Sequence, residues 1–86
     1  MEITVKKPTE AEVAQMKRQP TWGCGVSEFD WHYDSEEIFL LLEGEVTVEY
    51  AGGIAKIEPG DLATCPAGLS CVWKVTKPVR KHYVFR

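Results

Sequence analysis

The sequence lacks any long apolar run. Its longest, residues 38–42 (IFLLL), has five residues and is far too short to cross a bilayer, which takes about 20. The first ten residues, MEITVKKPTE, contain no apolar signal-peptide core. We therefore expect a cytoplasmic protein with no membrane partner.

Cysteine is also scarce. The three cysteines, Cys24, Cys65 and Cys71, show no paired spacing, which argues against a disulfide framework and favours free thiols in a reducing compartment. The sequence contains no Ser-His-Asp arrangement, no phosphate-binding glycine loop and no Cys-x-x-Cys pair. It therefore offers no motif for a catalytic triad, for nucleotide binding or for thiol-disulfide exchange.

Length and composition suit a single globular domain. The 86 residues are 44% apolar and 27% charged, and we expect one domain spanning residues 1–86. The formal net charge is −3, yet all eight charged residues within 28–49 are acidic and five of the ten basic residues follow Val72. Because these basic residues are interleaved with strand-like apolar ones, they indicate a solvated strand face, and we expect no nucleic-acid partner.

One helix is predicted near the start. Thr9 and Glu12 have the spacing of a capping box, in which each side chain satisfies a backbone N–H at the beginning of a helix. Lys17 and Arg18 would place positive charge in the last turn, and Pro20 would stop the helix. The pattern predicts a helix of about two turns.

After this helix, strand-like segments alternate with turns. The segment 45–50 (EVTVEY) alternates apolar and polar residues, and 51–53 (AGG) predicts a hairpin turn because glycine accepts a positive φ. Further turns are predicted at 59–61 (PGD) and 66–68 (PAG), with a bend at Pro78. The predicted strands include 37–42, 45–50, 54–58, 62–65, 70–75 and 80–86. Short strands at this spacing predict an all-β sandwich or barrel, and closing the sheet would remove exposed edges.

Two motifs bounded by glycines carry a more specific pattern. The first consists of Gly25, Trp31, Tyr33, Glu37 and Gly44, and the second of Gly60, Pro66, Gly68 and Cys71. Their spacing fits the cupin superfamily without a gap, and the sequence resembles the single-domain proteins grouped with the cupin domain of (S)-ureidoglycine aminohydrolase. The resemblance runs from Trp22 to the C-terminus. It implies a small cupin, or jelly-roll, β-barrel with one short N-terminal helix.

The residues at the metal-binding positions differ from those of typical cupins. There, two histidines, a glutamate and a third histidine hold a divalent metal such as iron or manganese. The corresponding residues here are Trp31, Tyr33, Glu37 and Cys71. Indole nitrogen can only donate a hydrogen bond, and a phenol with a pKa near 10 is a reluctant metal ligand. We therefore expect no cofactor, while the resemblance keeps a metal-dependent, aminohydrolase-like activity as an alternative.

A register shifted by one residue would give a different ligand set. Asp30 and His32 would then point inward with Glu37 and Cys71, and a soft divalent ion such as zinc could accept these four side chains. The shift needs a bulge, and it turns Trp31 and Tyr33, two large side chains that a small core would bury, toward solvent. We therefore favour the unshifted register, in which His32 faces outward.

In the unshifted register, strand alternation places six residues on one interior face: Trp31, Tyr33, Glu37, Phe39, Cys71 and Trp73. They could simply plug the barrel, as side chains usually do in small barrels. Alternatively, they could line a pocket in which aromatic rings hold a flat or apolar small molecule while Glu37 and Tyr33 orient it. We favour the pocket because a glutamate without a partner is costly in a dry core.

Two other functions stay open at this stage. Cys71 could act as a nucleophile, although a neighbouring carboxylate weakens a thiol in that role and His82 is, besides His32, the one imidazole that could assist it. The chain could also serve as a structural or partner-binding subunit. Single-domain cupins commonly form homodimers, and the acidic middle could meet the basic end across such an interface.

Overall fold

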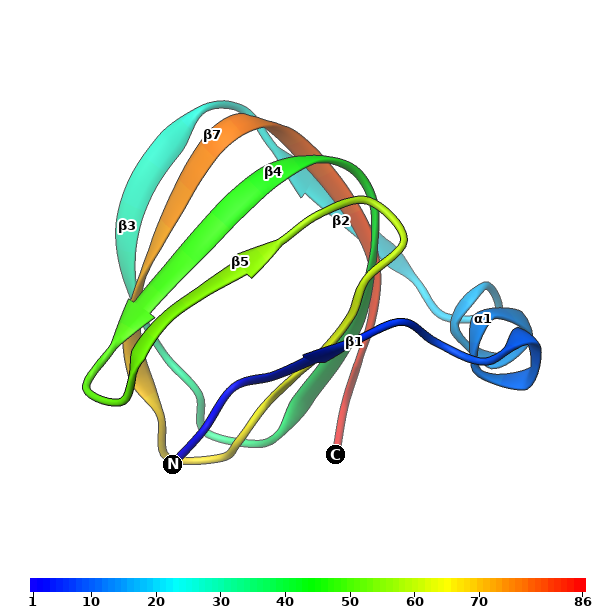
Figure 1. The fold of residues 1–86 in the computed structure, drawn as a ribbon, viewed down its shortest axis with the longest axis horizontal. Helices are drawn as coiled ribbons and strands as arrows, with labels where there is room; N and C mark the ends of the chain where they lie inside the picture. The colour runs from blue at the N-terminus through cyan, green and yellow to red at the C-terminus, as the bar shows by residue number, and fades with distance from the viewer.

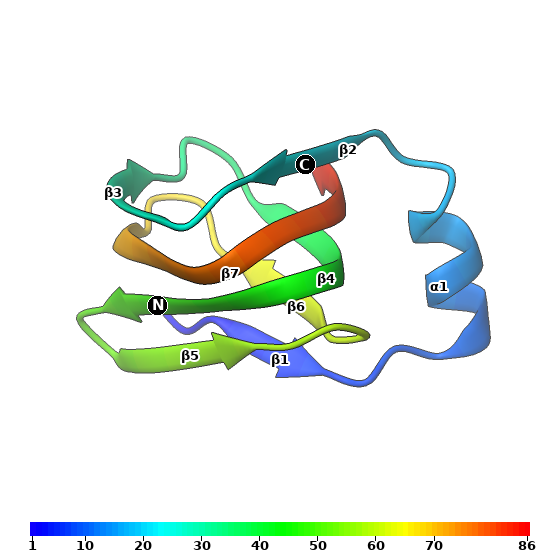
Figure 2. The same ribbon diagram turned by 90° about the horizontal axis from the view of Figure 1, so that it is seen from above.

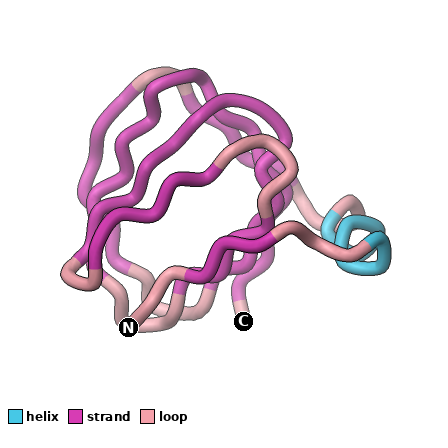
Figure 3. The backbone as a smooth tube through the Cα atoms, viewed as in Figure 1, coloured by secondary structure: helices cyan, strands magenta, loops and turns pink.

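Two long antiparallel strands, β4 (Glu37–Tyr50) and β7 (Ser70–Phe85), form the centre of the computed structural model, which describes all of residues 1–86. The shorter strands are β1 (Thr4–Lys6), β2 (Thr21–Cys24), β3 (Ser27–His32), β5 (Gly53–Ile57) and β6 (Leu62–Cys65). β2 and β3 pair with β7, β5 and β6 pair with β4, and β1 pairs with β6, all antiparallel. The resulting seven-stranded sheet curls into a barrel (Figure 1, Figure 3), which confirms the predicted all-β fold.

Both central strands run through regions where the sequence predicts a break. Segments 37–42 and 45–50 join into β4, and segments 70–75 and 80–86 join into β7. Register shifts in the pairing between Leu41 and Val46 bend β4. Pro78 lies opposite this bulge, where the regular ladder is interrupted and a missing N–H costs little.

Gly44 makes the bend possible. Its φ is +92°, and a Cβ at this position would collide with the carbonyl oxygen of Pro78 on the neighbouring strand. The bulge also changes which residues face inward, since Phe39 and Leu41 are buried before it and Val46 and Val48 after it. The first half of β4 thus pairs with β6 and the second half with β5.

The helix α1 (Glu10–Met16) lies outside one end of the barrel (Figure 2). Its predicted capping box is confirmed, because the Thr9 side chain accepts from the Glu12 N–H and the Glu12 side chain accepts from the Thr9 N–H. The predicted basic last turn is wrong: the helix ends at Met16, and Lys17 is the C-cap residue. No helix in the structure has the length and apolarity needed to cross a membrane.

The core fills the barrel and has a small satellite beneath the helix. The main cluster contains fourteen buried residues, among them Tyr33, Phe39, Trp73 and Val75. A separate cluster of Met16, Leu40 and Leu62 attaches α1 to the outer face of the sheet. Since neighbouring residues of a strand face opposite ways, Phe39 belongs to the interior and Leu40 to this outer contact.

Candidate ligand-binding cavity

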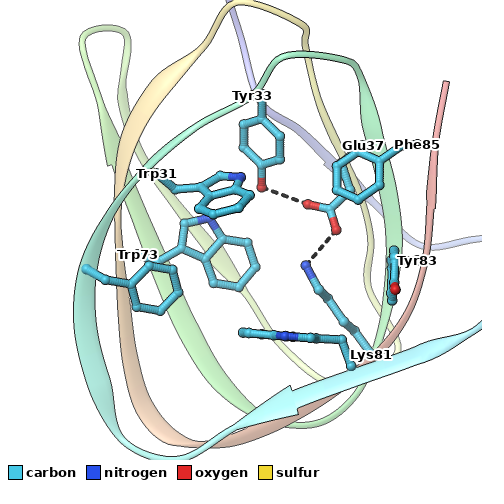
Figure 4. Close-up of a pocket in the computed structure, with 9 residues that line it drawn as sticks. Trp31, Tyr33, Glu37, Trp73, Lys81, Tyr83 and Phe85 are labelled. Atoms are coloured by element: carbon cyan, nitrogen blue, oxygen red, sulfur yellow. Dashed lines mark hydrogen bonds and ion pairs between the residues drawn. The ribbon is translucent and has the colours of Figure 1, made fainter.

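A cavity of about 240 Å³ opens between the strands on one side of the barrel. Most of the nine residues that line it are aromatic: Trp22, Phe29, Trp31, Tyr33, Glu37, Trp73, Lys81, Tyr83 and Phe85. They come from β2, β3, the loop after β3 (Tyr33), the start of β4 and both halves of β7, so the cavity exists only because the sheet curls back on itself (Figure 4). It combines an aromatic wall with one acidic and one basic side chain.

The charged residues of the cavity form a buried ion pair. Lys81 Nζ donates to Glu37 Oε2 at 2.6 Å, and the Tyr33 hydroxyl donates to Glu37 Oε1 at 2.8 Å (Figure 4). Glu37 is 2% exposed and Lys81 is 5% exposed. Both oxygens of the carboxylate are therefore held by donors, as a buried charge requires.

The pairing of the two long strands brings these residues together. In the β4–β7 register, Glu37 lies opposite Phe85 and Leu41 lies opposite Lys81. Glu37 and Lys81 thus sit four residues apart along the ladder, a gap that the long lysine side chain spans. Tyr33 is fixed through its backbone, because its N–H donates to the Leu69 carbonyl at 2.8 Å and its own carbonyl accepts from the Gly68 N–H at 2.7 Å.

Aromatic rings surround the Lys81 ammonium. Nζ lies 4.4 Å from the ring centroids of both Phe39 and Trp73, 5.1 Å from that of Trp22 and 6.0 Å from that of Tyr83. These distances lie within the range of cation–π attraction. The ammonium therefore contacts one carboxylate oxygen and several ring faces.

Burial changes the ionisation of the groups around this pair. It lowers the pKa of Lys81, against the opposing attraction of Glu37. It raises the pKa of the Tyr33 phenol, and the negative charge of Glu37 adds to that effect. The pKa of Cys65 is raised to about 12 by burial, and the pKa of Cys71 is raised by burial and then by Glu37. Near neutral pH these two residues are thiols, which disfavours Cys71 as a nucleophile.

One polar atom on the cavity wall has no hydrogen-bond partner. The indole nitrogen Nε1 of Trp73 is buried, and no acceptor in the chain lies within reach of it. Indole can only donate, and a buried donor without an acceptor is destabilising. Because this nitrogen has almost no accessible surface, its N–H is not open to a molecule in the cavity as the side chains stand.

The structure places four of the six residues predicted for the pocket on the cavity wall: Trp31, Tyr33, Glu37 and Trp73. Phe39 does not line it and instead lies under the Lys81 ammonium and packs on Trp73, with ring centroids 5.5 Å apart. Cys71 also lies outside the lining, and its thiol donates to the Trp31 carbonyl at 3.6 Å. Trp31 is 47% exposed and forms part of the mouth.

Lys81 is buried, although its place in a basic segment predicts a solvated strand face. The signal was present, because Trp73, Val75, Val79 and Lys81 are all odd-numbered residues of one strand, and all four are buried. Strand parity counted from Trp73 would have placed Lys81 inside. The other cavity residues that were missed are Trp22, Phe29, Tyr83 and Phe85.

The residues of the shifted register do not converge. Asp30 is exposed, and His32, with 54% of its side chain exposed, has its Nδ1 2.8 Å from Ser70 Oγ. His82 Nδ1 donates to the Gln19 carbonyl oxygen at 2.9 Å. The structure contains no group of three or more His, Cys, Asp or Glu side chains that could hold a metal ion.

The acidic middle and the basic end of the chain meet within one molecule. β4 carries four of the eight acidic residues and β7 four of the five basic ones, and the pairing brings Lys74 Nζ to within 2.7 Å of Glu49. Glu43 lies opposite Arg80, and Glu45 lies opposite Lys77. Part of this complementarity is therefore satisfied by strand pairing within one molecule.

Comparison with known proteins identifies the fold. Residues 11–83 match the family described as the EutQ-like cupin domain. A DUF861 family protein from Thermotoga maritima superposes with a TM-score of 0.93 at 45% identity, with 99% of this chain and 100% of that one covered. The cupin superfamily prediction is thereby confirmed. No curated protein matches the chain, and the specific resemblance to (S)-ureidoglycine aminohydrolase gains no support.

Two longer structures share the domain. A putative ethanolamine utilization protein Q from Salmonella typhimurium has a TM-score of 0.70 at 29% identity, and the EutQ protein of Clostridium difficile has a TM-score of 0.70 at 23% identity. Each match covers 76% of this chain but only 53% and 52% of those proteins. The chain thus spans about half the length of these two relatives and the full length of the Thermotoga protein.

Proposed function

Because the chain belongs to the EutQ-like cupin domain family, we propose that its barrel is a binding site for a small molecule, which enters beside Trp31 and reaches the Glu37–Lys81 pair. The supporting observation is that this buried ion pair opens into an aromatic cavity of about 240 Å³. Cupin barrels that differ in chemistry share this fold, so the proposal depends on the cavity and not on the fold alone.

The buried ion pair contributes little net free energy to the stability of the fold. Removing two charges from water costs several kcal/mol per ion, and apolar residues of similar volume often stabilise a core as well or better. A barrel of this size could be filled by its own side chains. The presence of Glu37 and Lys81 beside open space therefore favours recognition of a polar group.

The lining indicates what kind of molecule would fit. Trp31, Trp73 and Phe85 offer flat faces to an apolar or aromatic body. The Lys81 ammonium has three hydrogen-bond donors and a single acceptor in the chain, Glu37 Oε2. We infer a small, flat ligand that carries an acceptor oxygen.

A thermal-shift experiment tests the binding proposal. A panel of small aromatic and conjugated metabolites is screened for compounds that raise the melting temperature, because a ligand that binds only the folded state stabilises it. Trp31→Ala should abolish the shift. Ile54→Ala, which truncates another exposed apolar residue on β5, away from the cavity, should retain it. A panel without a single stabilising compound would contradict the proposal.

The residues present do not fit a metal-dependent, (S)-ureidoglycine aminohydrolase-like enzyme. Both oxygens of Glu37 are hydrogen-bonded, and the Lys81 ammonium lies 2.6 Å from Oε2. A divalent cation beside that ammonium would be repelled, and Trp31 and Tyr33 provide no imidazole.

The homodimer remains a prediction. Its electrostatic argument is weakened, because the acidic and basic strands neutralise each other within the chain. Light scattering at several protein concentrations measures the oligomeric state directly. A monomer at all concentrations would contradict a role as a dimeric structural subunit.

A further inference from the structure

Lys81 is the one cationic residue of the cavity, and its surroundings differ from those of an ordinary surface lysine. We propose that Lys81 captures a small aldehyde with a flat, apolar body, through reversible formation of an imine between Nζ and the carbonyl carbon. This inference rests on the proposed function, because the aldehyde must first enter the cavity. It names the chemical class of the ligand and the atom that would bind it.

Burial of Nζ works against its positive charge, although Glu37 and the surrounding rings attract the ammonium. An ammonium has three donors, and the single hydrogen-bond acceptor at Lys81 is Glu37 Oε2, while Phe39 and Trp73 cover other sides. Apolar walls disfavour the charged form, so burial lowers the pKa of this lysine. A lysine that can lose its proton in a desolvated pocket is the usual nucleophile for carbonyl compounds.

Lys74 provides a comparison within the same strand. It also pairs with a glutamate of β4, since its Nζ lies 2.7 Å from Glu49, but its side chain is 36% exposed. There the hydrogen bond to Glu49 raises the lysine pKa. The two lysines share their strand and their type of partner, and differ in burial. Lys74 therefore serves as an internal control.

Glu37 is placed to move the protons that imine formation needs. Its Oε2, 2.6 Å from Nζ, takes one proton from the ammonium. The amine lone pair then attacks the carbonyl carbon, a C–N bond forms, and the π electrons move to the carbonyl oxygen, which takes the proton back from Glu37. Tyr33, which donates to the other oxygen, holds the carboxylate in position.

Loss of water completes the reaction. The nitrogen gives a second proton to Glu37, Glu37 passes it to the hydroxyl, and water leaves as the nitrogen lone pair forms the C=N bond. In sum, a lysine ammonium and an aldehyde give a protonated imine and water, with the carboxylate regenerated. The product keeps one positive charge beside Glu37 and among the rings, so neither charge of the pair is left buried without a partner.

Reductive trapping tests the inference. The protein is incubated at neutral pH with benzaldehyde and cyanoborohydride, which reduces imines to stable benzylamines, and the modified lysines are identified by peptide mass spectrometry. Lys81 should be modified several-fold faster than Lys74. Benzyl alcohol, which has the same ring but no carbonyl, should slow the modification of Lys81 and leave that of Lys74 unchanged. In Lys81→Arg, which retains the positive charge, trapping inside the cavity should disappear.

Tryptophan fluorescence separates failure of this inference from failure of the proposed function. All three tryptophans of the chain line the cavity, so a molecule that enters it should change their emission. If benzyl alcohol changes the emission but Lys81 is trapped no faster than Lys74, imine formation is overturned and cavity binding stands. If neither compound changes the emission and Lys81 is not preferred, the inference is overturned and the binding proposal loses its support as well.

Discussion

Lys81 Nζ and Glu37 Oε2 lie 2.6 Å apart although their residues are 44 positions apart in the sequence, and neither residue is more than 5% exposed. For a buried pair of this kind, removing one charge costs more free energy than removing both. Loss of both charges can be nearly neutral, whereas loss of one leaves the other buried without a partner. The energetics of this pair can therefore be measured through single and double substitutions.

Glu37→Gln should lower the free energy of unfolding by about 3–5 kcal/mol, because it leaves the Lys81 ammonium uncompensated. The double variant Glu37→Gln with Lys81→Met should lose less than the sum of the single variants, as measured by urea unfolding. The matched surface pair, Glu49 and Lys74, should show a coupling of only about 0–1 kcal/mol. Equal coupling in the two pairs would contradict the role assigned to burial.

Gly44→Ala should destabilise the protein by about 1–3 kcal/mol. An alanine at this position would have to adopt a φ of +92°, which L residues rarely adopt, and its Cβ would collide with the Pro78 carbonyl oxygen. Gly25→Ala is the control, because a Cβ there has no atom within 4 Å, and its effect should stay within about 0.5 kcal/mol. Thermal unfolding of the two variants provides the comparison. A neutral Gly44→Ala would show that β4 does not need this bend.

Stability should fall at acidic pH through Asp61. Burial would raise the pKa of this carboxyl, but hydrogen bonds from Lys7 Nζ at 2.6 Å and the Glu58 N–H at 2.9 Å outweigh it, and the pKa is lowered. A lowered folded-state pKa means that the stabilisation is complete above the unfolded value of about 3.9 and is lost as the pH falls below it. Urea unfolding of wild type and Asp61→Asn should therefore differ at pH 7.

The same comparison at low pH provides the control. As protonation removes the charge of Asp61, the difference between wild type and Asp61→Asn should shrink toward zero. Glu10→Gln, a substitution on the exposed side of the helix, should change stability little at either pH. A difference between wild type and Asp61→Asn that is independent of pH would mean that shape, and not charge, accounts for the effect.

Chelation of metals should leave the protein unchanged. Protein prepared without a histidine tag and treated with EDTA should keep the melting temperature of the untreated sample, because both oxygens of Glu37 already accept hydrogen bonds and the Lys81 ammonium would repel a cation. Added manganese or zinc should not raise that temperature. Elemental analysis of the untreated protein gives an independent check. One equivalent of bound metal, with a loss of stability on chelation, would contradict this expectation.

Local sequence patterns predicted much of the fold. The turns at Gly60 and Gly68 have φ values of +92° and +88°, as the glycines suggested, and the helix begins at its predicted capping box. The short strand β1 was missed because its three residues carry no alternation that could be recognised. The breaks predicted within β4 and β7 were wrong, since a bulge can bend a strand without ending it.

The site was predicted in part. Motif spacing and alternation brought Trp31, Tyr33, Glu37 and Trp73 to attention, and these residues line the cavity. Lys81 was overlooked because a lysine in a basic segment is usually solvated. Phe29 and Tyr83 were missed because their contribution depends on how β3 and the end of β7 approach each other across the barrel.

The sequence by itself determined the periods and the turns: residues two apart share a strand face, and glycine permits a positive φ wherever it stands. Tertiary structure alone decided that Glu37 meets Lys81, that three tryptophans surround one cavity, and that opposite charges pair within the chain. The physical reason is that local patterns act over a few residues, whereas these contacts join residues far apart in the sequence. A local pattern sets which way a side chain points, whereas its partner depends on the register between strands distant in sequence and on the curvature that closes the sheet.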